Sequence, residues 1–329
     1  MTSPSGRDMS SETSHITRRT ILQATGAALA GLSAAGAASA RDTPWTVAET
    51  PTDRTLYDVA YTDAGAHAVG GAGTLLSRTA TGWQRVLDGG PTGNGNALYG
   101  ADVTDDGKRL WFVGASGAIG EYDVTTGSLR DHSAPMDVTN NFNDVAVTGD
   151  AGAANVYVAG DSGKLYYSFE NGESETWEYV TPASGSNINA VDFHGDRRGH
   201  IVDGNKTVLH TRDGETWTKI GLADANVNFY GVDSDGPDDV HVSGGGGMVF
   251  HWDGAEWTPS DTGDADLRDV EVSAGGAGLT VGGGGALYDL TDGTWRQQST
   301  PTGANLKAVT RGPTDIAVGA GGLVVERRT

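Results

Sequence analysis

The chain has 329 residues, of which 51 are glycine and none is cysteine, and its formal net charge is −21. So acidic a chain lacks the basic patches that nucleic acids and anionic membrane surfaces require, and we expect neither as a partner. The absence of cysteine excludes disulfide bonds. Abundant glycine without a long apolar helical pattern favours an all-β fold with many tight turns.

Residues 1–40 have the pattern of a twin-arginine export signal. Arg18 and Arg19 precede a weakly apolar run rich in alanine and glycine, which ends in the cleavage motif Ala38-Ser39-Ala40. The run is too short and too rich in glycine for a membrane-spanning helix, and no cysteine follows it to carry a lipid. We therefore expect residues 41–329 to form the mature domain, outside the cell or at its surface.

A unit of about 40 residues recurs along this domain, and each copy predicts one blade of a β-propeller. Each copy begins with an apolar residue, a polar or aromatic residue, a small or acidic residue, and then valine or alanine. The seven copies begin at Leu56, Leu98, Phe142, Ile188, Phe229, Leu267 and Leu306.

The rest of each copy predicts three further strands. The second strand is β-branched and ends in glycine, as at Gly114 and Gly244, and a glycine-rich turn leads from it into an apolar third strand. The fourth strand carries tryptophan except in the second copy, which has Leu129 near that place. These tryptophans are Trp83, Trp177, Trp217, Trp257 and Trp295.

The two ends of the domain together form the seventh of these blades. The copy that begins at Leu306 stops after three strands, whereas Trp45–Thr50 has the character of a fourth strand. Trp45 precedes Leu56 by the same number of residues as Trp295 precedes Leu306. We therefore predict an all-β, seven-bladed propeller whose N-terminal strand closes the last blade and removes its exposed edge.

The turn before the fourth strand carries a recognisable motif. Residues 211–217 read Thr-Arg-Asp-Gly-Glu-Thr-Trp, with related versions at 252–257 and 291–295. They resemble the Asp-box, or BNR repeat, and the domain is similar to the BNR-like propellers that include photosystem II assembly and stability factors. It also shares features with the WD40/YVTN-like superfamily. The resemblance implies that the aspartate caps its own turn and that the tryptophan packs between blades, but it implies no particular activity.

The charge composition resembles that of a known group of proteins. Only five of the 22 basic residues are lysine, and an acidic, lysine-poor chain that keeps its arginines is similar to the proteins of haloarchaea. Concentrated salt screens the repulsion between exposed carboxylates. We therefore expect a chain adapted to high salt.

The search for catalytic or metal-binding motifs is negative. The Phe/Tyr-Arg-Ile-Pro motif of sialidases is absent, and the histidines lack HxH or HExxH spacing, so we interpret them as scattered strand or surface residues. The acidic run at 233–239 is interpreted as a hairpin tip rather than a calcium loop. We predict no metal site, no cofactor and no catalytic residue.

One set of residues remains as a candidate ligand-binding site. The second residue of each copy should face the mouth of the central channel, beside connections rich in asparagine, and a ring of phenols, amides and cations suits a binding site. The alternative is that the asparagines cap turns and the ring residues pack between blades. The ring consists of Tyr57, Tyr99, Asn143, Asn189, Tyr230, Arg268 and Lys307.

These observations favour a monomeric, exported, non-enzymatic scaffold that binds protein or glycan at the cell surface. Two alternatives remain open at this point. One is a hydrolase or lyase that acts on extracellular glycans, because acidic residues are abundant. The other is an assembly factor for an exported or membrane complex, which the family resemblance suggests.

Overall fold

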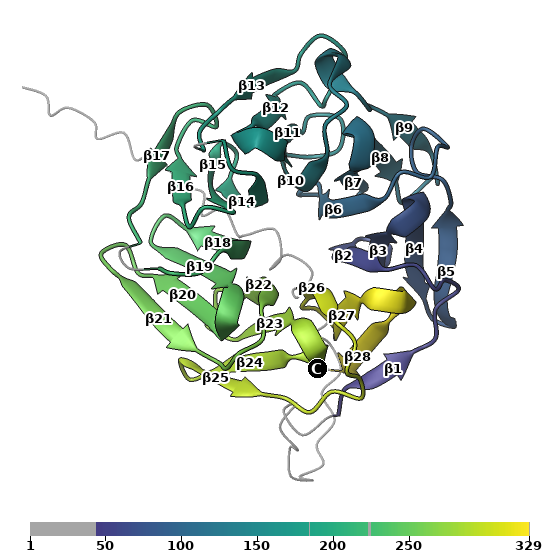
Figure 1. The fold of residues 1–329 in the computed structure, drawn as a ribbon. Helices are drawn as coiled ribbons and strands as arrows, with labels where there is room; N and C mark the ends of the chain where they lie inside the picture. The colour runs from purple at the N-terminus through teal and green to yellow at the C-terminus, as the bar shows by residue number, and fades with distance from the viewer. Residues whose placement is uncertain (1–43, 184, 223–224, 329) are drawn as a thin grey trace, which may run out of the picture.

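The computed structural model describes residues 44–183, 185–222 and 225–328. The predicted export signal at residues 1–40 lies outside these described residues. Within them the chain forms seven antiparallel four-stranded sheets around one axis (Figure 1), which confirms the predicted all-β, seven-bladed propeller. No helix in the described ranges is long and apolar enough to cross a membrane.

Each blade runs from an inner strand at the axis to an outer strand at the rim, and the blades follow in chain order. Blades 1 to 3 consist of β2 (Leu56–Thr62), β3 (Gly65–Gly70), β4 (Thr74–Thr79) and β5 (Gly82–Leu87); β6 (Leu98–Val103), β7 (Arg109–Gly114), β8 (Ile119–Asp123) and β9 (Leu129–Asp131); and β10 (Phe142–Thr148), β11 (Asn155–Gly160), β12 (Leu165–Ser168) and β13 (Glu178–Val180).

Blades 4 to 7 repeat this arrangement, and each inner strand begins at the predicted residue. They consist of β14 (Ile188–Gly195), β15 (Arg198–Asp203), β16 (Val208–Thr211) and β17 (Trp217–Lys219); β18 (Phe229–Gly236), β19 (Asp239–Gly244), β20 (Met248–Trp252) and β21 (Trp257–Asp261); β22 (Leu267–Val272), β23 (Gly278–Gly282), β24 (Leu287–Thr291) and β25 (Thr294–Gln297); and β26 (Leu306–Thr310), β27 (Thr314–Gly319), β28 (Val324–Arg328) and β1 (Thr46–Ala48).

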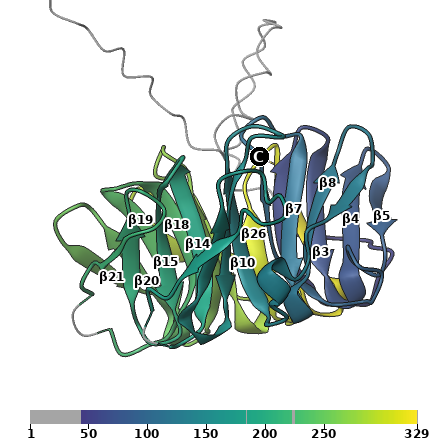
Figure 2. The same ribbon diagram turned by 90° about the horizontal axis from the view of Figure 1, so that it is seen from above.

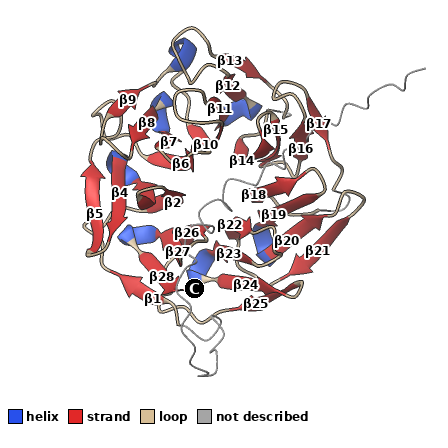
Figure 3. Ribbon diagram, turned by 180° about the vertical axis from the view of Figure 1, so that it is seen from behind, coloured by secondary structure: helices blue, strands red, loops and turns tan. Residues whose placement is uncertain are grey.

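The strands cross the thickness of a disc, so the connections lie on its two faces (Figure 2). The helical segments of the described chain are single 3₁₀ turns (Figure 3), and most join the second and third strands of a blade. They are η3 (Gly71–Gly73), η4 (Ala115–Gly117), η5 (Pro135–Asp137), η6 (Asp161–Gly163), η7 (Gly245–Gly247), η8 (Gly283–Gly285) and η9 (Ala320–Gly322). In blade 4 the carboxylate of Asp203 shapes this turn instead, because it accepts the N–H groups of Asn205 and Thr207 at 2.9 Å each.

The glycine that ends the second strand is required by close approach rather than by an unusual dihedral angle. Gly114 is extended, with a φ of −174°. A Cβ atom there would collide with the carbonyl oxygen of Ala97, which accepts the N–H of the next residue, Ala115, at 2.8 Å. The same bond recurs in blade 7, from Ala320 to Asn305 at 2.9 Å. The glycine is therefore repeated because the residue that precedes the inner strand lies directly against the end of the second strand.

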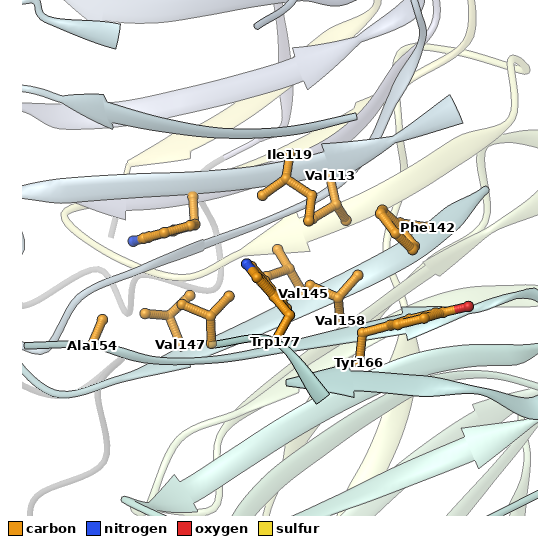
Figure 4. Packing of buried hydrophobic residues seen from close by; sticks show 11 residues of the cluster. Val113, Ile119, Phe142, Val145, Val147, Ala154, Val158, Tyr166 and Trp177 are labelled. Atoms are coloured by element: carbon orange, nitrogen blue, oxygen red, sulfur yellow. The ribbon is translucent and has the colours of Figure 1, made fainter. Parts of the chain in front are cut away.

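The hydrophobic core lies between neighbouring blades. Figure 4 shows one such interface, where Val113 and Ile119 of blade 2 face Val145, Tyr166 and Trp177 of blade 3, all of them buried. Burying one such side chain contributes about 1.5–3 kcal/mol. The repeat thus supplies a separate apolar layer at each blade interface rather than one central core.

Blade 7 is closed by the N-terminal strand, as predicted, although the strand is shorter than the predicted Trp45–Thr50. In β1, Thr46 pairs with Glu326 and Ala48 with Val324. Trp45 lies just before the strand with 4% of its surface exposed, and its ring lies 4.8 Å from the Arg327 guanidinium. The strand is short because the residues after Ala48 turn to start blade 1.

Two polar clusters fix this closing blade to its neighbours. Glu326 accepts two bonds from the Arg78 guanidinium of blade 1, at 2.8 Å each, and one from the Trp83 indole at 2.9 Å. On the other side, the buried Arg327 binds Asp289 of blade 6 at 2.6 and 3.0 Å. Because these charges are paired and hydrogen-bonded, their attraction offsets the desolvation that burial costs, and removal of one partner would leave the other charge uncompensated.

Candidate functional site at the channel mouth

The seven residues predicted for the channel mouth lie around one cavity on the propeller axis. The cavity has a volume of about 280 Å³ and is lined by side chains from the inner strands of every blade. Their positions agree with the prediction, because each is the second residue of its inner strand. The binding role of these residues stays a prediction. They are Tyr57, Tyr99, Asn143, Asn189, Tyr230, Arg268 and Lys307.

The ring is divided into sectors of different chemistry. Tyr57 and Tyr99 meet edge to face, with ring centroids 5.2 Å apart, on blades 1 and 2. Burial raises the pKa of the Tyr99 phenol, and Tyr57 adds to this rise, so the Tyr99 side chain is a neutral hydrogen-bonding group at ordinary pH. This edge-to-face pair forms the aromatic sector of the ring.

The amide sector lies on blades 3 and 4. Asn143 donates from Nδ2 to the carbonyl oxygen of Ile188 at 3.0 Å, and Asn189 donates in the same way to Phe229 at 2.6 Å. Each amide therefore links its blade to the next. Among the described residues, neither side-chain oxygen accepts a hydrogen bond, which leaves both oxygens able to accept from a ligand.

The cationic sector lies on blades 5 to 7. The Arg268 guanidinium lies 4.1 Å from the centre of the Tyr230 ring and binds Asp266 at 3.0 Å. Lys307 forms no ion pair within the described chain, and burial together with the charge of Arg268 lowers its pKa. Two neighbouring cations, one of them partly buried, favour an anion between them.

Three asparagines at the rim of the mouth have a structural role. Asn141, Asn187 and Asn305 each precede an inner strand, and the side-chain oxygen of each accepts an N–H from the 3₁₀ turn of the preceding blade. Asn187 accepts from Ser162 at 3.0 Å, and Asn305 accepts from Gly284 at 2.9 Å. The expectation that asparagines cap turns is therefore confirmed for these three asparagines.

Below the ring, a set of aspartates ties each blade to the next, which sequence reasoning did not predict. In each, one carboxylate oxygen accepts a main-chain N–H from the inner strand of the following blade, at 2.7–3.2 Å. Together they bridge every interface from blade 1 to blade 7. We call this set the carboxylate belt, and its members are Asp58, Asp102, Asp144, Asp192, Asp233 and Asp269.

The sequence accommodates the belt by pairing acids with small residues. The acid is either the third residue of the inner strand, as in Asp144, or the fifth, as in Asp102. Where it is the fifth, the third residue is glycine or alanine. A Cβ atom on Gly100 would lie 2.6 Å from Cα of Asp144 in the next blade, so the missing side chain makes room for that aspartate. This pattern of acidic and small residues at the third position of the inner strands was the sequence signal from which the belt could have been predicted.

Several belt carboxylates line the floor of the mouth cavity. Burial raises the pKa of Asp144 well above its usual range, and Asp58 and Asp269 raise it further. Its two oxygens accept the N–H groups of Val145 at 2.8 Å and Val191 at 2.9 Å. The two cations of the mouth thus lie above carboxylates whose oxygens already accept main-chain N–H groups.

The Asp-box turns are structural, as the resemblance implied. Oδ1 of Asp213 accepts the N–H groups of Glu215 at 3.0 Å and Thr216 at 2.7 Å, and these bonds hold the pKa of Asp213 at about 2. Asp253 caps its own turn in the same manner, at 2.9 and 2.8 Å. These aspartates lie at the outer hairpins, far from the channel mouth in the blade order.

Comparison with known proteins gives likeness of fold alone. No protein-family model matches the chain, and no curated protein matches it. Virginiamycin B lyase from Staphylococcus aureus is 14% identical, with a TM-score of 0.72 over 87% of this chain and 99% of the lyase. YCF48 bound to D1 peptide is 17% identical, with a TM-score of 0.68 over 87% and 95%.

A third similar structure is the WD40 propeller domain of Doa1, which is 12% identical, with a TM-score of 0.68 over 86% of this chain and 96% of that domain. The three structures span a lyase, a peptide-bound protein and a WD40 domain, so the shared feature is architecture. The chain therefore has the fold of a seven-bladed β-propeller.

Proposed function

We propose that this chain is an exported, non-enzymatic scaffold that binds an acidic group of a protein or glycan at the channel mouth. The observation that carries the proposal is the cationic sector. Arg268 and Lys307 face one cavity in a chain of net charge −21, and Lys307 lacks an ion pair within the described residues. An arginine can grip a carboxylate with two parallel bonds, and the lysine adds a point charge.

The size of the cavity supports a ligand that belongs to a larger molecule. At about 280 Å³ the mouth is at the lower limit of small-molecule sites, which are roughly 300–1,000 Å³. It accommodates one side chain, one chain end or one sugar ring. The phenols of Tyr57 and Tyr99 offer a flat apolar surface with hydrogen-bonding tips, which suits contact with either a peptide or a sugar.

The test measures what three immobilised full-length proteins retain at molar salt. Each protein is exposed to a surface extract of the source organism and to an array of peptides and glycans with and without carboxylates. The proteins are the wild type, an Arg268→Ala/Lys307→Ala variant and an Arg296→Ala/Lys219→Ala control on exposed outer strands. We expect the wild type and the control to retain the same acidic ligand, and the mouth variant to retain at least about tenfold less. Equal retention by all three proteins, or no specific retention by the wild type, would contradict the proposal.

A second candidate function is glycan cleavage, and Asp144 is the observation that favours it. A carboxyl whose pKa is raised at the floor of a cavity has the property of a general acid. Against this role, both of its oxygens accept main-chain N–H groups. Turnover on a panel of glycans that Asp144→Asn abolishes would establish the enzyme; folded protein without turnover would support the scaffold.

An assembly role is a special case of the binding proposal. YCF48 was solved bound to D1 peptide, and that propeller has the same architecture as this chain. Only the idea of a propeller that holds a segment of another protein transfers, and an acidic peptide among the ligands retained by the mouth would support it. Retention of glycans alone would exclude it.

The location and habitat of the protein are part of the proposal. The twin-arginine pattern in residues 1–40 supports export, and the acidic, lysine-poor composition supports a haloarchaeal, high-salt setting. We expect a melting temperature that rises with potassium chloride up to molar concentrations. A melting temperature unaffected by salt would argue against that setting.

A further inference from the structure

Blade 5 brings together three side chains that the sequence placed apart. Asp239 and His241 lie on β19, and His251 lies on the adjacent strand β20. The Nε2 atom of His251 lies 3.0 Å from Oδ1 of Asp239, and the Nδ1 atom of His241 lies 3.8 Å from the same oxygen. One nitrogen of each histidine and this carboxylate oxygen all lie within 4.8 Å of one another. The expectation of scattered histidines is wrong for this pair.

The strand register explains the cluster. His241 and His251 are direct partners across the hairpin, so their side chains point to the same face, and Asp239 shares that face two residues earlier. The two imidazole rings are stacked, with centroids 4.3 Å apart and planes inclined by 8°. The backbone therefore holds all three groups without help from loops, which is the more precise way to build a site.

The face that carries the cluster is directed toward blade 6. Val240 and Val242, which alternate with His241, pack in the cluster shared with blade 4. Val249, which lies on the face of His251, packs against Leu267 of blade 6. His241 is accordingly buried, with 8% of its side chain exposed, while His251 and Asp239 are 43% and 46% exposed. The cluster is thus anchored on one side and open to water on the other.

We propose that Asp239, His241 and His251 bind a divalent transition-metal ion of the Zn²⁺ class. Two imidazoles and one carboxylate are the ligands that such ions prefer, whereas Mg²⁺ and Ca²⁺ require oxygen. With metal–ligand bonds of about 2.0–2.2 Å, ligand atoms around zinc lie about 3.3–3.5 Å apart. The observed separations of 3.0 and 3.8 Å bracket that value, and a turn of the two stacked rings out of parallel directs both nitrogen lone pairs at the ion. Water on the open side completes the coordination.

Blade 4 provides an internal comparison. In its register, His200 and His210 occupy the places of His241 and His251, but Arg198 occupies the place of Asp239. The two rings there lie farther apart, with centroids at 6.2 Å. A guanidinium in place of the carboxylate removes one ligand and repels a cation. The equivalent positions of the two hairpins therefore carry a complete set of metal ligands in blade 5 and an incomplete set in blade 4.

The proposal is independent of the function proposed for the mouth, because the ring and this cluster share no residue. The bond between Asp239 and His251 could also serve as an ordinary hydrogen bond that needs no ion, and the experiment separates the two cases. Full-length protein without a histidine tag is dialysed against chelator and titrated with ZnCl₂ by calorimetry. Excess Mg²⁺ and molar salt are present to occupy the exposed carboxylates. Cobalt(II) absorption reports the ligand geometry of the same site.

Four proteins distinguish the outcomes: wild type, His251→Asn, Asp239→Arg and the matched control His210→Asn. We expect wild type and His210→Asn to bind one Zn²⁺ per chain and to gain thermal stability from it. The two blade 5 variants should bind at least about 100-fold more weakly, with unchanged circular dichroism. Absence of saturable binding by the wild type, or equal binding by all four proteins, would overturn the proposal.

Discussion

Removing one carboxylate of the belt should weaken the propeller far more than removing an ordinary surface charge. Asp102 accepts the N–H of Val103 and the N–H of Val147 in the next blade, at 2.7 Å each. Val103 and Val147 are both buried, so neither N–H can turn to water. Leaving a buried N–H without an acceptor costs about 1–3 kcal/mol, and Asp102→Ala leaves two such groups. We therefore expect the free energy of unfolding to fall by about 2–6 kcal/mol.

The conservative variant sharpens this prediction. Asp102→Asn keeps one acceptor oxygen and turns an NH₂ group toward the other N–H, so about half the loss should remain. Asp53, with 97% of its side chain exposed, provides the control, and Asp53→Ala should change stability by less than about 0.5 kcal/mol. Equilibrium urea unfolding at fixed salt gives the free energies. A loss for Asp102→Ala no larger than that for the control would refute the belt as a source of stability.

Three further predictions concern closure and pH. Deletion of residues 44–50 should expose the edge of β28 and yield a protein that aggregates or melts at much lower temperature, measured by size-exclusion chromatography and calorimetry; an unchanged melting temperature would contradict the closure. Glu326→Ala should cost about 1.5–3 kcal/mol, because Arg78 and Trp83 lose their shared acceptor, and a double variant with Arg78→Ala should recover part of the loss in urea unfolding. Burial lowers the pKa of His200 to about 3, so the unfolded chain takes up a proton there below about pH 6.5 and the folded chain does not. His200 alone should therefore lower stability by about 1.4 kcal/mol per pH unit from 6.5 toward 3, and His67 and His194, whose pKa values burial lowers to about 4, add to the slope. His200→Gln should reduce the total slope in urea unfolding by about that one contribution, and an unchanged slope would contradict the prediction.

The blades could be predicted from sequence because their signals are local. The inner strands begin at the predicted residues, from Leu56 to Leu306, since each begins with a buried apolar residue after a turn. The ring of seven side chains followed from the same register, which places the second residue of every inner strand at the cavity. Because the repeat occurs seven times, a correct prediction of the strand register in one copy predicts the inner strands of all seven blades.

The belt and the histidine cluster could not be predicted in this way, because each depends on a partner outside its own strand. Asp102 is recognisable as an acid in the repeat, but its acceptor role depends on Val147 in the next blade. His241 and His251 meet only because the hairpin is centred on Gly246, in the middle of a run of four glycines that left the register open. The width of the turn decides which residues pair, and composition does not fix it.

The central claim is that the channel mouth binds an acidic ligand through its cationic sector. The most direct measurement is a calorimetric titration of the ligand retained from the surface extract or array into wild type, the Arg268→Ala/Lys307→Ala variant and the Arg296→Ala/Lys219→Ala control, at one salt concentration. We predict equal affinity for wild type and control and at least about tenfold weaker binding by the mouth variant. Equal affinity in all three proteins would contradict it, because the ligand would then bind elsewhere on the propeller.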